Sequence, residues 1–222
     1  MWDDFSDNCL EKTRWALIDE LYGLATPIPA LGECLNPRRQ FFAQDDDHLS
    51  VFVDSDATVN NYRQHTLVPL TGPMCYKQVE VIASLDSVSL GSDSRLAYLS
   101  VGMALTRIAG NGYLEIRLQA SNATGRFTPL ITSRLTLNEG GYQDFGTLPY
   151  TLGQPTILTF SVHGNKLTAY ANGQLLAGPF SIINDPCLLG LGYYADQDTT
   201  LDGYFDAVRA TLIQASPQAA PP

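Results

Sequence analysis

The segment with the clearest capacity for chemistry is an alternating run at residues 114–119, which reads Leu-Glu-Ile-Arg-Leu-Gln. Side chains two residues apart on a β-strand share a face, so Glu115 and Arg117 would lie side by side. Retaining cleavage of a glycosidic bond needs two carboxylates about 5 Å apart. Here the neighbour is a guanidinium, so we predict either a salt bridge on the sheet or a pair that contacts a ligand.

Patterns for nucleophilic hydrolysis are missing from the sequence. The chain has no Gly-x-Ser-x-Gly sequence, the turn that exposes the nucleophile of many hydrolases. Its histidines, His48, His65 and His163, stand in polar or turn-like contexts without a nearby serine and aspartate pattern. The sequence therefore predicts that the chain is not an enzyme.

An acidic segment near the C-terminus could bind a metal ion. Asp196, Asp198 and Asp202 place three carboxylates in what we expect to be one loop. Calcium prefers several carboxylate and carbonyl oxygens, so a structural Ca2+ is one interpretation, and solvated turn residues are the other. The loop is not an EF-hand, because Leu201 stands where that loop needs glycine.

The four cysteines are scattered, without the close pairs typical of zinc sites. Two disulfides are therefore the favoured interpretation, and three connectivities are open. We favour a bridge that closes a short N-terminal loop and a second one that joins an early strand to a late strand. These two pairs are Cys9 with Cys34 and Cys75 with Cys187.

The composition limits the partners. The chain has 222 residues, 45% of them hydrophobic, and 23 acidic residues against 13 basic ones give a net charge of -10. This charge would be repelled by nucleic-acid phosphates and anionic lipids, so we expect neither nucleic acid nor direct membrane insertion. We expect one domain at residues 1–213, tethered to other domains through a Pro/Ala-rich linker or tail at 214–222.

Alternating apolar segments separated by Gly, Asn and Asp clusters predict strands along most of the chain. Gly164-Asn165 and Asn172-Gly173 suit two-residue hairpin turns, so residues 156–176 predict an antiparallel meander. The fold class is therefore an all-β, two-sheet antiparallel sandwich. One short helix or turn is expected at residues 12–24. The other strands are expected at residues 39–44, 49–54, 78–85, 97–105, 113–120, 130–137, 188–194 and 205–213.

Three motifs resemble those of the concanavalin A-like lectin/glucanase superfamily of jelly rolls, which includes laminin G-like and pentraxin-like domains and family 16 glycoside hydrolases. They are Asp-Asp-Phe-Ser at residues 3–6 with Trp15, Leu-Thr-Ala-Tyr-Ala-Asn-Gly at 167–173, and the closing segments at 189–194 and 203–209. The resemblance covers nearly the whole chain. It implies two curved sheets with a concave face that often holds carbohydrate.

The resemblance also implies particular site residues. Relatives often hold a structural calcium near the first and last strands, which points to Asp4 and Asp206. The family 16 hydrolases carry a Glu-x-Asp-x-x-Glu strand, and this sequence has no such motif. Tyrosines can stack on sugar rings while polar groups bind hydroxyls, and only one of Tyr193 and Tyr194 can face a given groove. The expected ligand contacts are Tyr98, Asn111, Glu115, Arg117, Tyr170 and Tyr193.

Fold and residues together favour a non-catalytic, extracellular or cell-surface module that binds a glycan or a surface protein. One alternative is a structural or protein-interaction domain on a filament, capsid or sensor. A second alternative is an atypical glycoside hydrolase or a polysaccharide lyase. Because one fold serves many functions, the residues on the concave face must decide among them.

Overall fold

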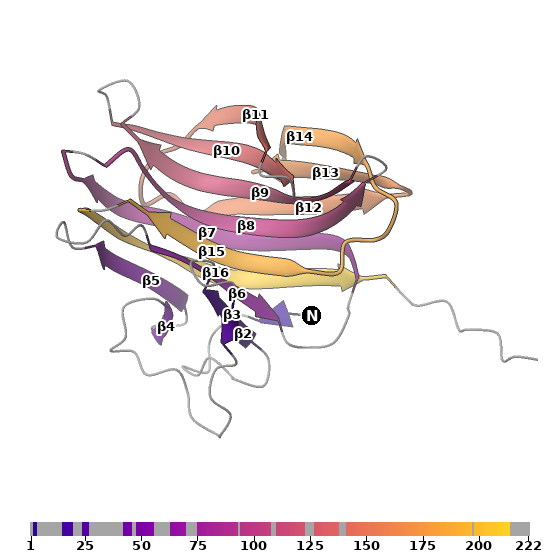
Figure 1. Cartoon of the computed structure of the whole chain (residues 1–222), viewed down its shortest axis with the longest axis horizontal. Helices are drawn as coiled ribbons and strands as arrows, with labels where there is room; N and C mark the ends of the chain where they lie inside the picture. Colours follow the sequence, from indigo (N-terminus) through magenta and orange to yellow (C-terminus); the bar gives the residue numbers. More distant parts are fainter. Residues whose placement is uncertain are drawn as a thin grey trace, which may run out of the picture.

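The computed structural model describes residues 2–3, 15–19, 24–26, 42–45, 48–55, 63–69, 75–92, 94–107, 110–122, 127–137, 141–196 and 198–213. Within these ranges all of the regular structure is β-strand, and the pairings between the strands are antiparallel. The strands form two layers (Figure 1). This confirms the predicted two-sheet sandwich. The tail predicted at residues 214–222 lies outside the described residues.

Sheet A and sheet B each hold eight of the described strands. The order in sheet A is β14 (Gln174–Ser181), β13 (Lys166–Ala171), β12 (Thr156–His163), β7 (Tyr76–Leu90), β16 (Thr199–Leu212), β5 (His48–Ser55) and β4 (Phe42–Asp45), with β1 (Trp2–Asp3) also paired to β16. The order in sheet B is β11 (Tyr142–Pro149), β10 (Thr128–Leu137), β9 (Gly110–Ser121), β8 (Leu96–Arg107), β15 (Leu189–Ala195), β6 (Arg63–Pro69), β2 (Trp15–Asp19) and β3 (Leu24–Thr26).

The predicted meander is present as β12, β13 and β14. Its second turn, Asn172-Gly173, has positive φ at both residues (48° and 76°), which is the backbone that this dipeptide tolerates. The Asn172 side-chain oxygen also accepts a hydrogen bond of 2.9 Å from the N–H of Ile157. The turn therefore fixes the register of β12 and β13 and connects β13 to β14.

The predicted N-terminal helix is wrong. Residues 15–19 form β2, which pairs with β6, and residues 24–26 form β3, which pairs with β2. Trp15, Ile18 and Leu21 match the spacing of a helix face, but a segment this short takes its structure from a neighbouring strand edge when one is available. β6 itself was not predicted.

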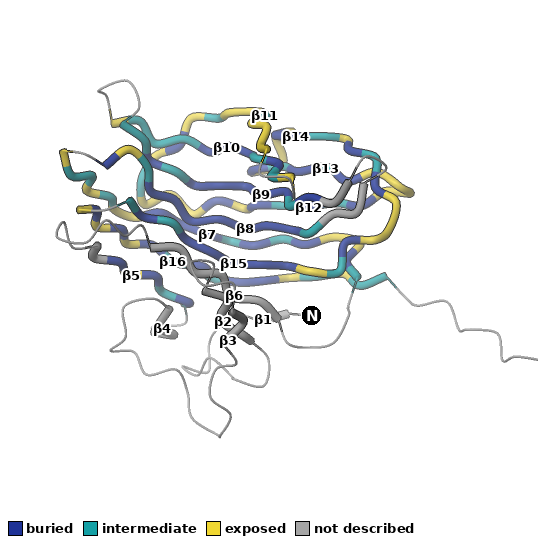
Figure 2. Tube along the Cα trace, in the orientation of Figure 1, coloured by how far each residue is buried: buried dark blue, intermediate teal, exposed yellow. Residues whose placement is uncertain are grey.

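The core lies between the sheets and is built from the inward-facing residues of each strand. Burial alternates along β12, β13 and most of β16 in sheet A, whereas Figure 2 shows β8, β9 and β15 of sheet B mostly buried and β11 mostly exposed. Leu114, Ile116 and Leu118 of β9 are fully buried, as are Val79 and Val81 of β7. The alternate residues of β9 therefore face away from the core.

One edge of sheet A, strand β14, meets one edge of sheet B, strand β11. A Cβ atom added to Gly146 of β11 would lie 2.1 Å from the carbonyl oxygen of Leu176 in β14, so only glycine permits this approach. Next to it, the rings of Phe145 and Phe180 pack edge to face with centroids 4.8 Å apart. The sandwich is thereby closed along one side.

Tyr150 links the end of β11 to the middle of β7. Its hydroxyl accepts a hydrogen bond of 2.9 Å from the N–H of Leu85 and lies 3.1 Å from the carbonyl oxygen of Gln154. Leu85 precedes Asp86, where the register between β7 and β16 shifts. Burial raises the pKa of Tyr150, so the hydroxyl stays protonated and can donate as well as accept.

Tyr150→Phe should lower the free energy of unfolding by about 1–3 kcal/mol, because the buried N–H of Leu85 loses its acceptor. Urea unfolding followed by circular dichroism would measure the change. Tyr142→Phe is the matched control: Tyr142 is 64% exposed, so removal of its hydroxyl should change stability by less than about 0.5 kcal/mol. Equal effects of the two substitutions would contradict the role assigned to Tyr150.

Candidate functional site

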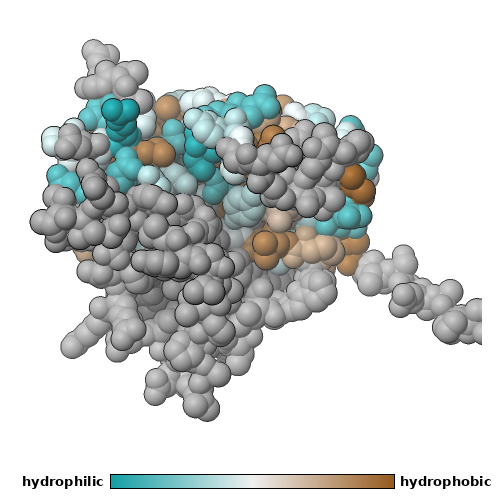
Figure 3. Space-filling view, in the orientation of Figure 1, coloured by the Kyte–Doolittle hydropathy of each residue, from teal (hydrophilic) through white to brown (hydrophobic). Residues whose placement is uncertain are grey.

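The outer face of sheet B carries a cluster of charged and aromatic side chains. On β9, Glu115, Arg117 and Gln119 alternate with core residues and point to this face. The sequence folds this way because the leucines and isoleucine between them fill the core. Figure 3, which looks onto this face, shows hydrophilic side chains gathered over β9 and β10.

Glu115 and Arg117 form the predicted salt bridge. The Arg117 Nε donates to Glu115 Oε2 at 2.8 Å, and Nη2 contacts the same oxygen. Their side chains are only 8% and 6% exposed, respectively. Charge interactions are stronger at such a water-poor position than in bulk water, so the pair fixes both side chains on the face of the sheet.

Aromatic rings continue the cluster across β8 and β15. The guanidinium of Arg117 lies over the ring of Tyr98, 4.2 Å from its centroid. Tyr98 in turn stacks on its cross-strand partner Tyr194, with centroids 5.3 Å apart and planes 14° from parallel. The Tyr194 hydroxyl donates to Asp196 Oδ1 at 2.6 Å. Two flat rings and one flat cation therefore form a stack that crosses three strands.

A second group occupies β10 and the edge strand β11. Arg134 binds Asp144 through two hydrogen bonds, Nε to Oδ1 at 2.6 Å and Nη2 to Oδ2 at 2.8 Å. Its guanidinium also lies 4.0 Å from the ring centroid of Tyr142. The hydrogen bond from Arg134 lowers the pKa of Asp144, and the same bond raises the pKa of Arg134. Both groups are therefore charged at neutral pH.

These side chains form one polar row across five strands, from β15 through β8, β9 and β10 to β11. Arg134 is the cross-strand partner of both Glu115 and Asp144, which joins the two groups. Thr132 donates to the Gln119 side-chain oxygen at 3.1 Å beside them. The polar row consists of Tyr194, Tyr98, Arg117, Glu115, Gln119, Arg134, Asp144 and Tyr142.

The structure brings together three of the six predicted ligand contacts, Tyr98, Glu115 and Arg117. Asn111 lies on β9, but its side chain is outside the described part of the structure. The other two positions must be corrected. Tyr170 faces outward from sheet A, on the opposite side of the sandwich, in register with Thr159 of β12. Tyr193 is 1% exposed in the core, so its neighbour Tyr194 faces the row.

The acidic residues predicted to bind calcium do not lie in one loop. Strand β16 begins at Thr199, so Asp202 projects from the same strand as Asp206 rather than from the turn. Asp196 accepts the backbone N–H groups of Arg95 and Leu96 at 2.7 and 2.8 Å. Among the described residues no group of three His, Cys, Asp or Glu side chains suits a metal ion, and Asp4 is not described. A structural calcium stays a prediction.

Asp198 has a separate structural position. Its carbonyl oxygen accepts the N–H of Gly91 at 2.7 Å, and a Cβ atom at Gly91 would lie 2.2 Å from its carboxylate. Its φ of 53° marks the tight turn that connects β15 to β16. Hydrogen bonds to residues 95 and 96 therefore explain the carboxylate at 196 without a metal ion, whereas Asp198 makes its bond to Gly91 through the backbone.

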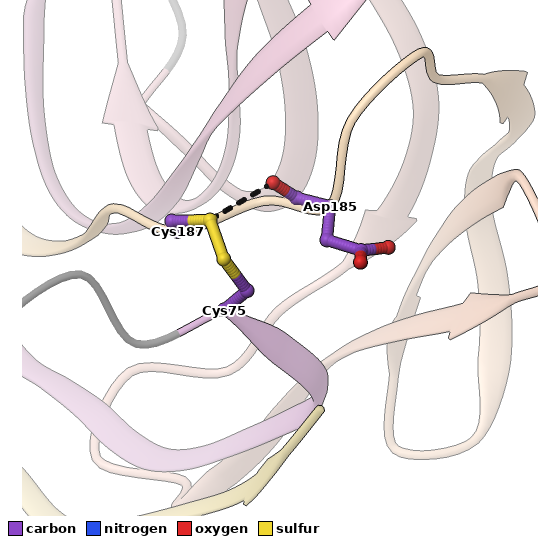
Figure 4. Close-up of a disulfide and its surroundings, with 3 residues drawn as sticks. All are labelled: Cys75, Asp185 and Cys187. Atoms are coloured by element: carbon purple, nitrogen blue, oxygen red, sulfur yellow. Dashed lines mark hydrogen bonds between the residues drawn. A yellow bond between two sulfur atoms is a disulfide. The ribbon is translucent and has the colours of Figure 1, made fainter. Parts of the chain in front are cut away.

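The predicted bridge between Cys75 and Cys187 is present, and it spans 112 residues (Figure 4). Cys75 precedes β7 of sheet A and Cys187 precedes β15 of sheet B, so the bridge ties the two sheets together. The N–H of Tyr76 donates to the carbonyl oxygen of Pro186 at 2.9 Å beside it. Cys9 and Cys34 lie outside the described residues.

Sequence reasoning missed the β11 part of the row. Tyr142 and Asp144 alternate on one face of β11, but Gly146 and Pro149 obscured the strand pattern. Arg134 was inside a predicted strand, yet its partner was unknown without β11. The alternation of Tyr142 and Asp144 directly after the Gly140-Gly141 dipeptide was the available sequence signal.

No family model matches the sequence, and no curated protein matches it. Solved structures do match. A laminarinase catalytic domain from Thermotoga petrophila has a TM-score of 0.59 and 13% identity over 95% of both chains. A substituted variant of LamA from Z. galactanivorans, in complex with laminaritriose and laminaritetraose, has a TM-score of 0.63 and 14% identity over 95% of this chain and 97% of that one.

A third match is a Mycobacterium tuberculosis antigen described as a pseudo beta-1,3-glucanase, with a TM-score of 0.62 and 13% identity over 96% of this chain and 98% of that one. The expectation that the chain is not an enzyme is contradicted by the match to the catalytic domain of a laminarinase, which covers 95% of both chains. Identities this low establish the architecture alone. The chain has the concanavalin A-like jelly-roll fold of the family 16 glucanases and laminarinases.

Proposed function

We propose that the chain is an atypical glycoside hydrolase that binds a polysaccharide across the polar row and uses Glu115 as its central carboxylate. The observation that carries this proposal is the position of Glu115, on the outer face of β9 in the middle of a row of aromatic and hydrogen-bonding side chains. Tyrosine rings suit the apolar faces of sugars, and the charged groups suit their hydroxyls. The jelly-roll fold shared with glucanases supports the same function.

Glu115 suits the role of general base. A carboxylate that takes a proton from water lets the water oxygen attack the anomeric carbon while the leaving oxygen departs with a proton from solvent. Positions two and four residues further along β9 hold Arg117 and Gln119, neither of which is an acid. A retaining mechanism with two carboxylates on this strand is therefore excluded, and the proposed reaction is a direct displacement.

The nearest carboxylate along the row is a poor proton donor. Asp144 lies two strands from Glu115, which corresponds to about 10 Å between strand axes. Two hydrogen bonds from Arg134 keep the pKa of Asp144 low, so it carries no proton at neutral pH. Since a positioned acid or base typically contributes about 100- to 10,000-fold, turnover should be slower than that of a two-carboxylate glycosidase by about this factor.

Hydrolysis is favoured over elimination by the pairing of the arginines. A lyase must neutralise the carboxylate of a uronate, for which a free cation is suitable. Arg117 is bound to Glu115 and Arg134 to Asp144. A uronate would have to displace one of these carboxylates, and displacement of the buried one would leave it without a cation.

The proposed location is extracellular. A disulfide such as that between Cys75 and Cys187 persists in oxidising compartments, and polysaccharides occur there as substrates. In the described part of the chain, no helix has the length and apolar character needed to cross a bilayer. Attachment to further domains through residues 214–222 remains part of the proposal.

The test is prolonged incubation with laminarin, mixed-linkage glucan and alginate, followed by assays for new reducing ends and for unsaturated uronates. We expect slow release of reducing ends from a neutral glucan and no unsaturated product. Glu115→Leu combined with Arg117→Met should abolish the release while the fold is retained, because both charges of the pair are removed together.

Glu80→Gln is the matched control, because Glu80 is a carboxylate on the outer face of sheet A and should not affect turnover. Activity that persists in the double variant, or disappears in the Glu80 variant, would show that Glu115 is not the base. No product from any polysaccharide would reject the hydrolase proposal itself.

A further inference from the structure

Tyr142 combines high exposure with a fixed orientation. It is 64% exposed on the edge strand β11, yet the guanidinium of Arg134 covers one face of its ring at 4.0 Å. Arg134 is held in turn by two hydrogen bonds to Asp144. An exposed tyrosine ordinarily loses side-chain entropy when it binds a ligand. Here the contact with Arg134 already restricts the side chain in the free protein, so binding should cost less entropy.

The three side chains lie at the end of the polar row, near Glu115. Arg134 stands in register between Glu115 and Asp144, and Thr136 stands between Tyr113 and Tyr142. Tyr113 lies over Gly102, because a Cβ atom there would be 2.2 Å from the tyrosine ring. A polysaccharide that passes Glu115 across the strands would therefore reach Tyr142 after about two strand spacings, or about 10 Å.

The charges of Arg134 and Asp144 indicate which class of sugar could bind beside Tyr142. Arg134 and Asp144 neutralise each other, and their side chains are 23% and 53% exposed. Asp144 can accept hydrogen bonds from sugar hydroxyls, and the guanidinium has donors beyond the two that bind Asp144. Because the pair has no net charge, a carboxylated or sulfated sugar would gain no net attraction from it, whereas an uncharged sugar can use the hydrogen-bonding groups of both partners.

We propose that Tyr142, Arg134 and Asp144 form a subsite for one uncharged sugar residue of the polysaccharide, which stacks on the open face of Tyr142 and gives its hydroxyls to Asp144. This proposal rests on the proposed function of the polar row. It adds to that function a substrate class, neutral glycans, and a binding contribution from Tyr142 and Asp144 of the edge strand β11. The low pKa of Asp144 supports the role, because the carboxylate remains an acceptor over the whole neutral range.

The experiment is calorimetric titration of the full chain with neutral oligosaccharides, laminaritetraose and a mixed-linkage glucan tetrasaccharide, and with an alginate tetrasaccharide. We expect a neutral oligosaccharide to bind more tightly than the uronate. Tyr142→Ala should weaken that binding by about tenfold through the loss of ring stacking. Tyr142→Phe keeps the ring and should bind within about twofold of the original chain.

Tyr170→Ala is the second control, because Tyr170 lies on the opposite sheet and should leave the affinity unchanged. Unchanged affinity in Tyr142→Ala, with reducing ends still released from a glucan, would overturn the subsite and leave the hydrolase proposal standing. Tighter binding of the alginate oligosaccharide would overturn the neutral class. Binding of none of the three would overturn the subsite, and the separate release assay would then decide the hydrolase proposal.

Discussion

Arg117→Met should lower the free energy of unfolding by about 3–5 kcal/mol, because it leaves the buried carboxylate of Glu115 without its cation. The side chains of this pair are 6% and 8% exposed, so water cannot replace the lost partner at low cost. The ring of Tyr98 would also lose the guanidinium that covers it. Urea unfolding at neutral pH, followed by tyrosine fluorescence, would measure the loss.

The double variant Arg117→Met with Glu115→Leu is expected to recover most of this stability. Replacement of a buried ion pair by apolar groups of similar volume is often neutral or stabilising, whereas removal of one partner is costly. If the double variant lost as much free energy of unfolding as the single one, the effect would come from packing around Tyr98 and not from the unpaired carboxylate. The result also decides how the activity assay of the double variant is interpreted.

Removal of the disulfide between Cys75 and Cys187 by substitution of both residues with serine should cost about 4 kcal/mol. The bridge closes a loop of 112 residues, and in the chain-entropy account the stabilisation increases with loop length, to between about 4 and 5 kcal/mol for a loop this long. Unfolding in urea without reductant is the measurement, and the original chain is the reference. Peptide mapping of the original chain should yield the Cys75–Cys187 pair.

Serine substitution is preferred to a reductant because it leaves Cys9 and Cys34 unchanged. The bridge ties β7 of sheet A to β15 of sheet B outside the polar row, so the folded variant should retain glycan binding. If the free energy of unfolding fell by less than about 1 kcal/mol, other contacts would already hold residues 75 and 187 close together in the unfolded chain. Loss of binding at retained stability would show that the bridge also shapes the row.

The sequence predicted the strands whose apolar residues alternate without interruption. β9, β12 and β13 fall in this class, because each buries every second residue against the opposite sheet. β2 and β16 were misjudged for opposite reasons. Trp15 and Ile18 have helical spacing by chance, and Thr200 and Asp202 make the start of β16 resemble a loop, although Leu201 between them is fully buried.

The site was only partly predictable. Glu115 and Arg117 were found because the period of a strand places them together, and that relation is local. Which of Tyr193 and Tyr194 faces outward depends on the register of β15 with β8, which a single segment does not specify. The contact of Arg134 with Asp144 depends on a pairing with an edge strand whose glycine and proline hid it.

The meeting of β11 and β14 protects one edge of each sheet from pairing with other chains. A sheet edge exposes unpaired N–H and C=O groups that can accept a strand from a second molecule. Here the edge of sheet B lies so close to the edge of sheet A that Gly146 has no space for a side chain. A foreign strand would have to displace β14 to dock on β11. The edge strand can therefore present Tyr142 to solvent without becoming a template for aggregation.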